Sequence, residues 1–193
     1  MTSRPPAVPT RPTGARKEAM ARTRESLIDA GLRLAERTGL AGLSVNLIVA
    51  EAGVAKGTFF HHFGDRASYL LALHREFHDR LTIQVQAAID GMPPGRRRLT
   101  TIANTYLNGC LRDRGVRALL LEARAEPAVT DEISRRNHAS AELCRSDFVA
   151  LKRPHPYESA QLWIGMAAEA ALIEHQAAKA LPGIREALER FLN

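Results

Sequence analysis

The sequence has two cysteines, few aromatic residues and no long hydrophobic run. Cys110 and Cys144 lie far apart, and neither belongs to a CxxC pair, so we expect two reduced, buried thiols instead of a zinc or redox site. No segment is as long and apolar as a membrane span, and the first 20 residues lack the apolar stretch of a signal peptide. We therefore expect a cytoplasmic protein with no membrane association.

Enzyme motifs are also lacking. The sequence contains no glycine-rich phosphate loop, nucleophile elbow or acidic metal cluster. Its most enzyme-like segment is His74-Arg75-Glu76-Phe77-His78, in which two histidines four residues apart share a helix face that could bind a metal. Glu76 lies on another face, so the segment is not HExxH. We expect no enzyme activity, no metal and no cofactor, and we interpret the histidines as a solvated or pocket-edge face, with metal binding as the alternative.

What the sequence does have is positive charge. The formal net charge is +6 and the pI is about 9.9, which is compatible with a polyanionic partner. Much of this charge lies near the start of the chain, among prolines and small residues, on Arg4, Arg11, Arg16, Lys17, Arg22 and Arg24. We expect residues 1–22 to form a flexible basic arm, which either contacts DNA or is a solvated tail.

Apolar residues recur at three- and four-residue spacing along most of the chain, which predicts an all-α fold of about nine helices. The first helix begins near Thr23 and ends at Thr38-Gly39, Ser44 caps a second helix, Gly53 ends it, and a third covers KGTFFHHF. After Gly64-Asp65 a long fourth helix runs from Arg66 to Ala88. Proline and glycine then separate helices at about residues 97–111, 116–124, 129–151, 157–180 and 184–192.

Two short helices joined by a glycine turn are typical of a helix-turn-helix, whose second helix enters the major groove of DNA. The segment from Val45 to Phe63 fits this pattern, with Gly53 in the turn. We expect the core-facing residues to be Ile48, Ala52, Val54 and Phe59. We expect the residues on or near the exposed face to be Ala55, Lys56, Thr58, Phe60, His61 and His62.

The segment from Ser26 to Leu70 resembles the TetR family of regulators. The matching features, in order, are Ser44, Ala52-Gly53-Val54, Lys56-Gly57-Thr58, His62-Phe63 and Arg66. The resemblance implies a three-helix DNA-binding domain at residues 23–66 and a helical ligand-binding and dimerisation domain at residues 67–193. It also implies a bacterial transcriptional regulator, by default a repressor, which binds a palindromic double-stranded operator as a homodimer and responds to an unidentified small-molecule effector.

Three residues depart from the family pattern. Phe60 stands where a tyrosine is common and lacks its phosphate-binding hydroxyl, Val49 replaces a small residue, and Arg66 replaces the more usual lysine. From side-chain chemistry we expect phosphate contacts from Ser44, Lys56, His62 and Arg66. We expect base contacts from Thr58, Phe60 and His61, and close backbone approach at Gly57.

In the C-terminal half we expect a dimer interface and a ligand pocket. A small-residue stripe and the last helix are expected to form the dimer interface through Ala160, Ile164, Ala167, Ala168, Ala171, Leu172, Ile184, Leu188 and Phe191. A ligand pocket is expected to draw on Tyr106, Cys110, Arg124, Asn137, Phe148, Trp163 and Met166. The alternative for both sets is packing inside the subunit's own core.

A second function remains open from the sequence. The chain could be a ligand-binding or protein-interaction module that retains the fold but binds DNA poorly, and the lost phenolic oxygen at Phe60 is the one feature that favours it. Specific, salt-sensitive operator binding separates the two functions.

Overall fold

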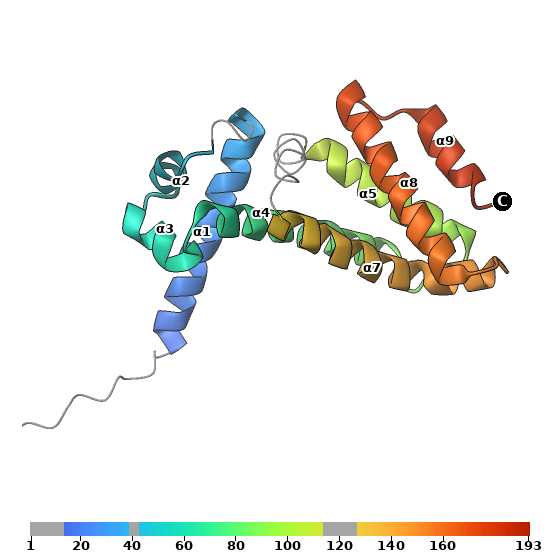
Figure 1. Ribbon diagram of the computed structural model, residues 1–193, viewed down its shortest axis with the longest axis horizontal. Helices are drawn as coiled ribbons and strands as arrows, with labels where there is room; N and C mark the ends of the chain where they lie inside the picture. The colour runs from blue at the N-terminus through green and yellow to red at the C-terminus, as the bar shows by residue number, and fades with distance from the viewer. Residues whose placement is uncertain (1–13, 39–42, 114–126) are drawn as a thin grey trace, which may run out of the picture.

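A computed structural model describes residues 14–38, 43–113 and 127–193, which form helices joined by turns and contain no strand (Figure 1). The helices are α1 (Gly14–Thr38), α2 (Val45–Ala52), α3 (Lys56–Phe63), α4 (Arg66–Ala88), α5 (Arg96–Arg112), α7 (Pro127–Ala150), α8 (Pro156–Ala177) and α9 (Pro182–Arg190). The expected all-α fold is confirmed. The helix expected at residues 116–124 lies outside the described residues.

Helix α1 is longer than the sequence predicted. It begins at Gly14 instead of Thr23, so residues 14–22 are helical and the expected flexible arm is wrong for them. Their side chains are exposed, and in Figure 1 this end of α1 projects beyond α2 and α3. Alanine, arginine, lysine and glutamate are strong helix formers, and Arg22 lies 3.9 Å from Glu18 one turn away. Intrinsic propensity therefore extends α1 beyond the part that packs.

The N-terminal helices share a core in which α4 crosses α1 closely. Tyr69 of α4 is fully buried, and its hydroxyl donates a 2.7 Å hydrogen bond to the carbonyl of Leu27. Gly31 faces the same ring, and a Cβ there would overlap the Tyr69 hydroxyl oxygen. Glycine at this position is what allows α1 and α4 to pack at this distance.

Helix α4 passes from the N-terminal helices into the C-terminal bundle (Figure 1). At its middle, Arg80 pairs with Asp29 of α1 at 2.7 Å. Nearby, Arg75 pairs with Glu132 of α7 at 2.9 Å. The same helix is thus bound to both parts of the molecule within two turns, and a shift of α4 relative to α7 would be passed on to α1.

The C-terminal bundle combines α5, α7, α8 and α9 around a core that includes Leu99, Leu107, Phe148 and Trp163. Prolines begin α7, α8 and α9, as their fixed backbone angle and missing N–H allow. No helix in the described part of the chain is long and apolar enough to cross a membrane.

Both cysteines are buried, as predicted, and they are not bonded to each other. Burial and the neighbouring Asp147 raise the pKa of the Cys144 thiol to about 12. The Cys144 thiol is therefore protonated and unreactive at neutral pH.

Candidate nucleic-acid interface

The turn between α2 and α3 is built by local sequence signals. Ser44 precedes α2 in an extended conformation, and its side chain accepts a 3.2 Å hydrogen bond from the Leu47 N–H. Gly53 ends α2 with a φ of +67°, the left-handed conformation that glycine adopts without strain. Its N–H donates to the Ala50 carbonyl at 3.2 Å, after which the chain enters α3. The predicted bounds of both helices are confirmed.

Helix α3 has a buried face and an exposed face. Phe59 and Phe63 are buried in the N-terminal core, whereas Phe60 between them is 45% exposed. The rings of Phe59 and Phe60 meet edge to face with centroids 5.4 Å apart, so packing against Phe59 helps to orient the exposed ring. Lys56, Gly57 and His61 are exposed beside Phe60, and Thr58 and His62 border this face and are partly buried.

The surroundings of His62 determine its charge. Partial burial, followed by the charges of His61 and Arg24, lowers the pKa of His62 below its ordinary value of 6.5. In the DNA-free protein His62 is therefore mostly neutral at pH 7, and it offers a hydrogen bond more readily than a charge.

Arg24, one of the basic residues near the start of the chain, lies beside α3. Its guanidinium lies 5.3 Å from the centroid of the Phe63 ring, a cation–π distance. A positive charge from α1 thus lies at the C-terminal end of α3. The sequence analysis missed this because the two residues are far apart in the chain.

Two helix N-termini lie close together on the same domain. Arg66, the first residue of α4, directs its Nε toward the carbonyl of Leu43 at 3.5 Å, and Leu43 immediately precedes the cap of α2. Asp65 caps α4 by accepting a 2.7 Å hydrogen bond from the Ser68 N–H. The structure therefore brings Ser44 and the exposed Arg66 to neighbouring positions, where helix N-termini favour anions.

An ion-pair cluster fixes α2 on α1. Glu51 of α2 accepts hydrogen bonds from Arg37 at 2.7 Å and from Arg33 at 3.0 Å. The hydrogen bond from Arg37 has the larger effect and the one from Arg33 the next largest, and together they lower the pKa of Glu51 to about 2. Glu51 is therefore ionised at any working pH, and the pairs help to set the angle at which α2 leaves α1.

A separate cavity of about 720 Å³ lies in the C-terminal bundle between α4, α5, α7 and α8. Of the expected pocket residues, Tyr106, Asn137 and Trp163 line it. Cys110, Phe148 and Met166 do not line it, so the expectation is corrected for them, and Arg124 lies outside the described residues. Cys110 and Phe148 belong to the packed core, because their faces of α5 and α7 meet neighbouring helices.

The cavity is also lined by His74 and His78, and by Arg136 and Cys144, which the sequence analysis did not assign to it. The rings of His74 and His78 are 4.4 Å apart on α4, but Glu76 pairs with Arg80 instead of joining them. Within the described ranges no group of three or more histidine, cysteine, aspartate or glutamate side chains is placed to hold a metal ion. The histidine pair is a pocket-edge face, as the sequence analysis favoured.

The expected dimer stripe on α8 needs correction. Ala160, Ala167 and Ala171 are buried within the subunit, as is Leu188 of α9. They pack inward because α8 lies across α5 and α7, and this inner face also holds Trp163. Periodicity identified the apolar face of α8 correctly, but that face meets the subunit's own core.

The remaining expected interface residues keep some exposure. Phe191 is 62% exposed, and partial exposure is shared by Ile164, Ala168, Leu172 and Ile184. The outer face of α8 adds Leu162, which is 72% exposed, and the exposed Gly165. Exposed apolar side chains are therefore still present on α8 and α9, whereas Ile164 and Ala168 line the cavity.

The N-terminal domain matches a known sequence family. Residues 27–73, which include α2, α3 and the turn between them, match the family described as "Bacterial regulatory proteins, tetR family". Residues 27–73 therefore carry the TetR-family sequence pattern. This agrees with the resemblance carried by Ser26–Leu70.

A curated TetR-family relative is the transcriptional regulator AcuR of Cereibacter sphaeroides. It is 37% identical to this chain over 110 residues, which is 52% of this chain and 49% of AcuR. The chain thus spans about half the length of this relative.

Solved structures extend the likeness to nearly the whole chain. A transcriptional regulator from Rhodococcus sp. RHA1 superposes with a TM-score of 0.75 at 21% identity, covering 88% of this chain and 93% of that chain. The multidrug binding protein EbrR, solved with imidazole, has a TM-score of 0.67 at 23% identity. The superposition covers 88% of this chain and 94% of the EbrR chain. At these identities the likeness is one of fold, and it supports an N-terminal helix-turn-helix followed by a helical C-terminal domain.

Proposed function

We propose that this protein is a non-enzymatic transcriptional regulator that binds a palindromic operator as a homodimer in the bacterial cytoplasm, represses transcription and releases DNA when a small molecule binds. The observation that supports DNA binding most strongly is the division of α3 into two faces. Phe59 and Phe63 hold the helix in the core, and Lys56, Phe60 and His61 are presented outward. A short helix that presents such a face behind a glycine turn fits the major groove.

The contacts divide by chemistry. Phosphates are bound by Ser44, Lys56 and Arg66, with His62 adding a hydrogen bond. Bases are contacted by Thr58, Phe60 and His61, and the ring of Phe60 is suited to a thymine methyl group. Gly57 keeps the backbone of α3 close to the groove, because no side chain stands between them. The DNA-binding unit comprises α1 to α3 and the start of α4, and the ligand-binding and dimerisation unit comprises the rest.

A single α3 reads few base pairs, so dimerisation supplies affinity through a second half-site. The outer face of α8 and α9 is the surface that supports a dimer, through Leu162, Leu172 and Phe191. Two copies of these helices would bury this apolar surface in a four-helix contact.

The ligand response follows from the position of α4. One side of α4 lines the cavity through His74 and His78, and its first residue, Arg66, lies beside the α2 cap. A ligand that favours a different position of α4 relative to the bundle would change the distance between the two α3 helices in the dimer. DNA and ligand then weaken each other's binding reciprocally.

The test is selection of genomic fragments with the purified full-length chain, followed by titration of the enriched site at several salt concentrations. A palindromic site bound tightly and with steep salt dependence is the expected result. Weak binding without sequence preference would instead identify a module that has kept the fold and lost DNA recognition. This is the alternative that the missing tyrosine hydroxyl at Phe60 favours.

A further inference from the structure

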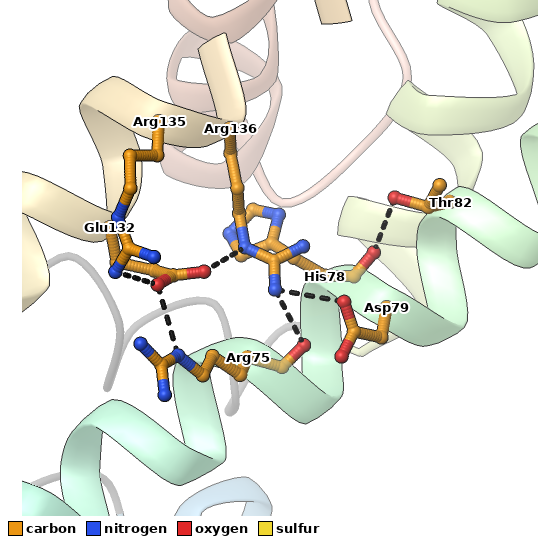
Figure 2. A network of polar contacts seen from close by, with 7 residues as sticks. All are labelled: Arg75, His78, Asp79, Thr82, Glu132, Arg135 and Arg136. Atoms are coloured by element: carbon orange, nitrogen blue, oxygen red, sulfur yellow. Dashed lines mark hydrogen bonds and ion pairs between the residues drawn. The ribbon is translucent and has the colours of Figure 1, made fainter. Parts of the chain in front are cut away.

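The cavity in the C-terminal bundle is bordered by a cluster of charges between α4 and α7, drawn in Figure 2. Glu132 of α7 is nearly buried and accepts hydrogen bonds from Arg75, Arg135 and Arg136. Arg136 also donates to the Asp79 carboxylate at 2.8 Å and to the Arg75 carbonyl at 3.3 Å. Three guanidinium groups therefore face two carboxylates, and the cluster keeps one positive charge.

Arg136 is the member of this cluster that offers its charge to the cavity. It lines the cavity wall, and its side chain is only 22% exposed to solvent. Its Nε and Nη2 are occupied by Glu132, Asp79 and the Arg75 carbonyl, whereas Nη1 has no hydrogen-bond partner among the described residues (Figure 2). An acceptor on a ligand can therefore bind Nη1 without breaking an existing bond.

A second unused donor belongs to a residue of the same wall. Trp163 is 1% exposed, and its indole Nε1 has no hydrogen-bond partner within the part of the chain that the structure describes. Its ring lines this cavity as well as a smaller one between α5, α8 and α9. A buried donor left without an acceptor is costly, and a ligand oxygen would relieve that cost.

The acidic side chains at the cavity do not favour a cationic ligand. Asp79 and Glu142 are both mostly exposed, and Glu142 is paired with Arg145 at 3.2 Å. Asp79 is already bound to Arg136. The remaining wall is largely apolar and includes Leu81, Val85, Ile102 and Ile164.

We propose that the effector is an organic carboxylate with an apolar body and a second oxygen along that body. The carboxylate binds Arg136, the hydrocarbon lies against the apolar wall, and the second oxygen accepts the hydrogen bond of Trp163. This identifies the ligand class of the site proposed above and rests on that proposed function.

The contact between the ligand carboxylate and Arg136 also explains how ligand binding would affect α4. Within the part of the chain that the structure describes, Asp79 pairs with α7 through Arg136, and because its carboxylate is exposed, weakening that pair costs little. A ligand carboxylate on Nη1 adds a second negative charge beside Asp79 on the same guanidinium, so the two carboxylates repel each other and the Arg136–Asp79 pair weakens. Ligand binding therefore loosens one of the two ion-pair links between α4 and α7, while Arg75 to Glu132 remains.

The chain carries its own reporter for this experiment, because Trp163 is its only tryptophan and lines the cavity. The full-length protein is titrated with octanoate, octylammonium and 1-octanol, which share one hydrocarbon chain and differ in charge, and the fluorescence is followed. We expect octanoate to bind about tenfold or more tightly than either of the others. Equal or tighter binding of octylammonium or octanol would overturn the proposal.

Arg136→Gln and Arg135→Gln provide a matched pair. Both substitutions remove a guanidinium bonded to Glu132, but Arg135 is mostly exposed and does not line the cavity. We expect R136Q to lose about tenfold or more in octanoate affinity, R135Q to bind octanoate as the wild type does, and Arg136→Lys to recover part of the loss. Thermal melts monitor folding, and a folded R136Q that binds octanoate as tightly as R135Q would contradict the assignment.

Trp163→Phe tests the second oxygen, with binding measured by calorimetry because the fluorophore is lost. The wild type is expected to bind 8-hydroxyoctanoate more tightly than octanoate, and W163F to bind the two alike. A preference that survives in W163F would remove Trp163 from the ligand contacts.

Operator titrations on the same preparations separate this inference from the proposed function. If the wild type binds its operator but prefers the ammonium or the alcohol, the ligand class is wrong and the regulator stands. If octanoate binds at Arg136 while no specific operator is bound, the ligand class stands and DNA regulation fails.

Discussion

Single buried carboxylates join the helices of the C-terminal bundle, and Glu174 of α8 is one of them. Arg185 of α9 donates to it from Nε at 2.7 Å and from Nη2 at 2.8 Å, and the Leu181 N–H donates at 2.9 Å. Burial by itself raises the pKa of Glu174, but the bonds from Arg185 and Leu181 outweigh it and leave the pKa below 4.5. Its ionised form therefore stabilises the fold.

Glu174→Gln should lower the free energy of unfolding by about 3 kcal/mol at neutral pH, because it leaves the partly buried Arg185 without its counter-charge. The folded-state pKa lies below the unfolded value of 4.5, so the contribution is present above pH 4.5 and is lost as pH falls through the folded-state value. In denaturant titrations at several pH values, the free energies of unfolding of wild type and variant should become equal in acid.

Glu186→Gln is the control, because it breaks an exposed pair with Arg190. It should lower the free energy of unfolding by less than about 1 kcal/mol, and an equal cost in the two variants would contradict this account.

At the level of elements, α2 and α3 were predictable because their ends are set locally. Ser44 and Gly53 supply a cap and a left-handed stop within a few residues, so the sequence alone places both helix boundaries. The exposed and buried sides of α3 also follow from spacing, since Phe59 and Phe63 are one turn apart and Phe60 is not in phase with them.

Contacts between distant segments were not predictable in this way. Periodicity marks Ala160, Ala167 and Ala171 as one face, but it does not say whether α5 and α7 or another subunit covers that face. Arg136 and Asp79 are 57 residues apart, and their meeting depends on how α7 packs on α4. The start of α1 was missed for a different reason, because helix propensity outweighed the lack of an apolar stripe in residues 14–22.

Gly57→Ala separates stability from DNA binding within α3. A Cβ at this position would meet nothing within 4 Å, and alanine is the better helix former, so the variant should be about 0.5 kcal/mol more stable in denaturant titrations. Its operator affinity should fall, because the added methyl group stands on the face that approaches the DNA. An unchanged affinity in gel-shift or anisotropy titrations would show that α3 does not come close to DNA at Gly57.

For the whole molecule, the proposed dimer surface on α8 and α9 can be tested by substitution. Leu162→Arg replaces an exposed apolar side chain of this surface by a charge, so the mass measured by light scattering should fall from that of the proposed dimer to that of a monomer at micromolar concentration. Operator affinity should fall with it, because one protomer holds one half-site.

Val149→Arg is the matched control for this substitution. Val149 is also an exposed apolar residue, but it lies on α7 and not on α8 or α9. It should leave the mass and the operator affinity unchanged. If V149R dissociates the protein and L162R does not, the subunits join through another surface.

The most direct test of the central claim, that the exposed face of α3 binds operator DNA, is the salt dependence of operator binding by Lys56→Ala beside Lys179→Ala. Both residues are exposed lysines, one on α3 and one after α8, so the substitutions change the net charge equally. K56A should weaken binding and reduce the slope of log K against log salt by about 1 for each protomer, whereas K179A should match the wild type. Equal slopes for K56A and K179A would contradict the placement of DNA on α3.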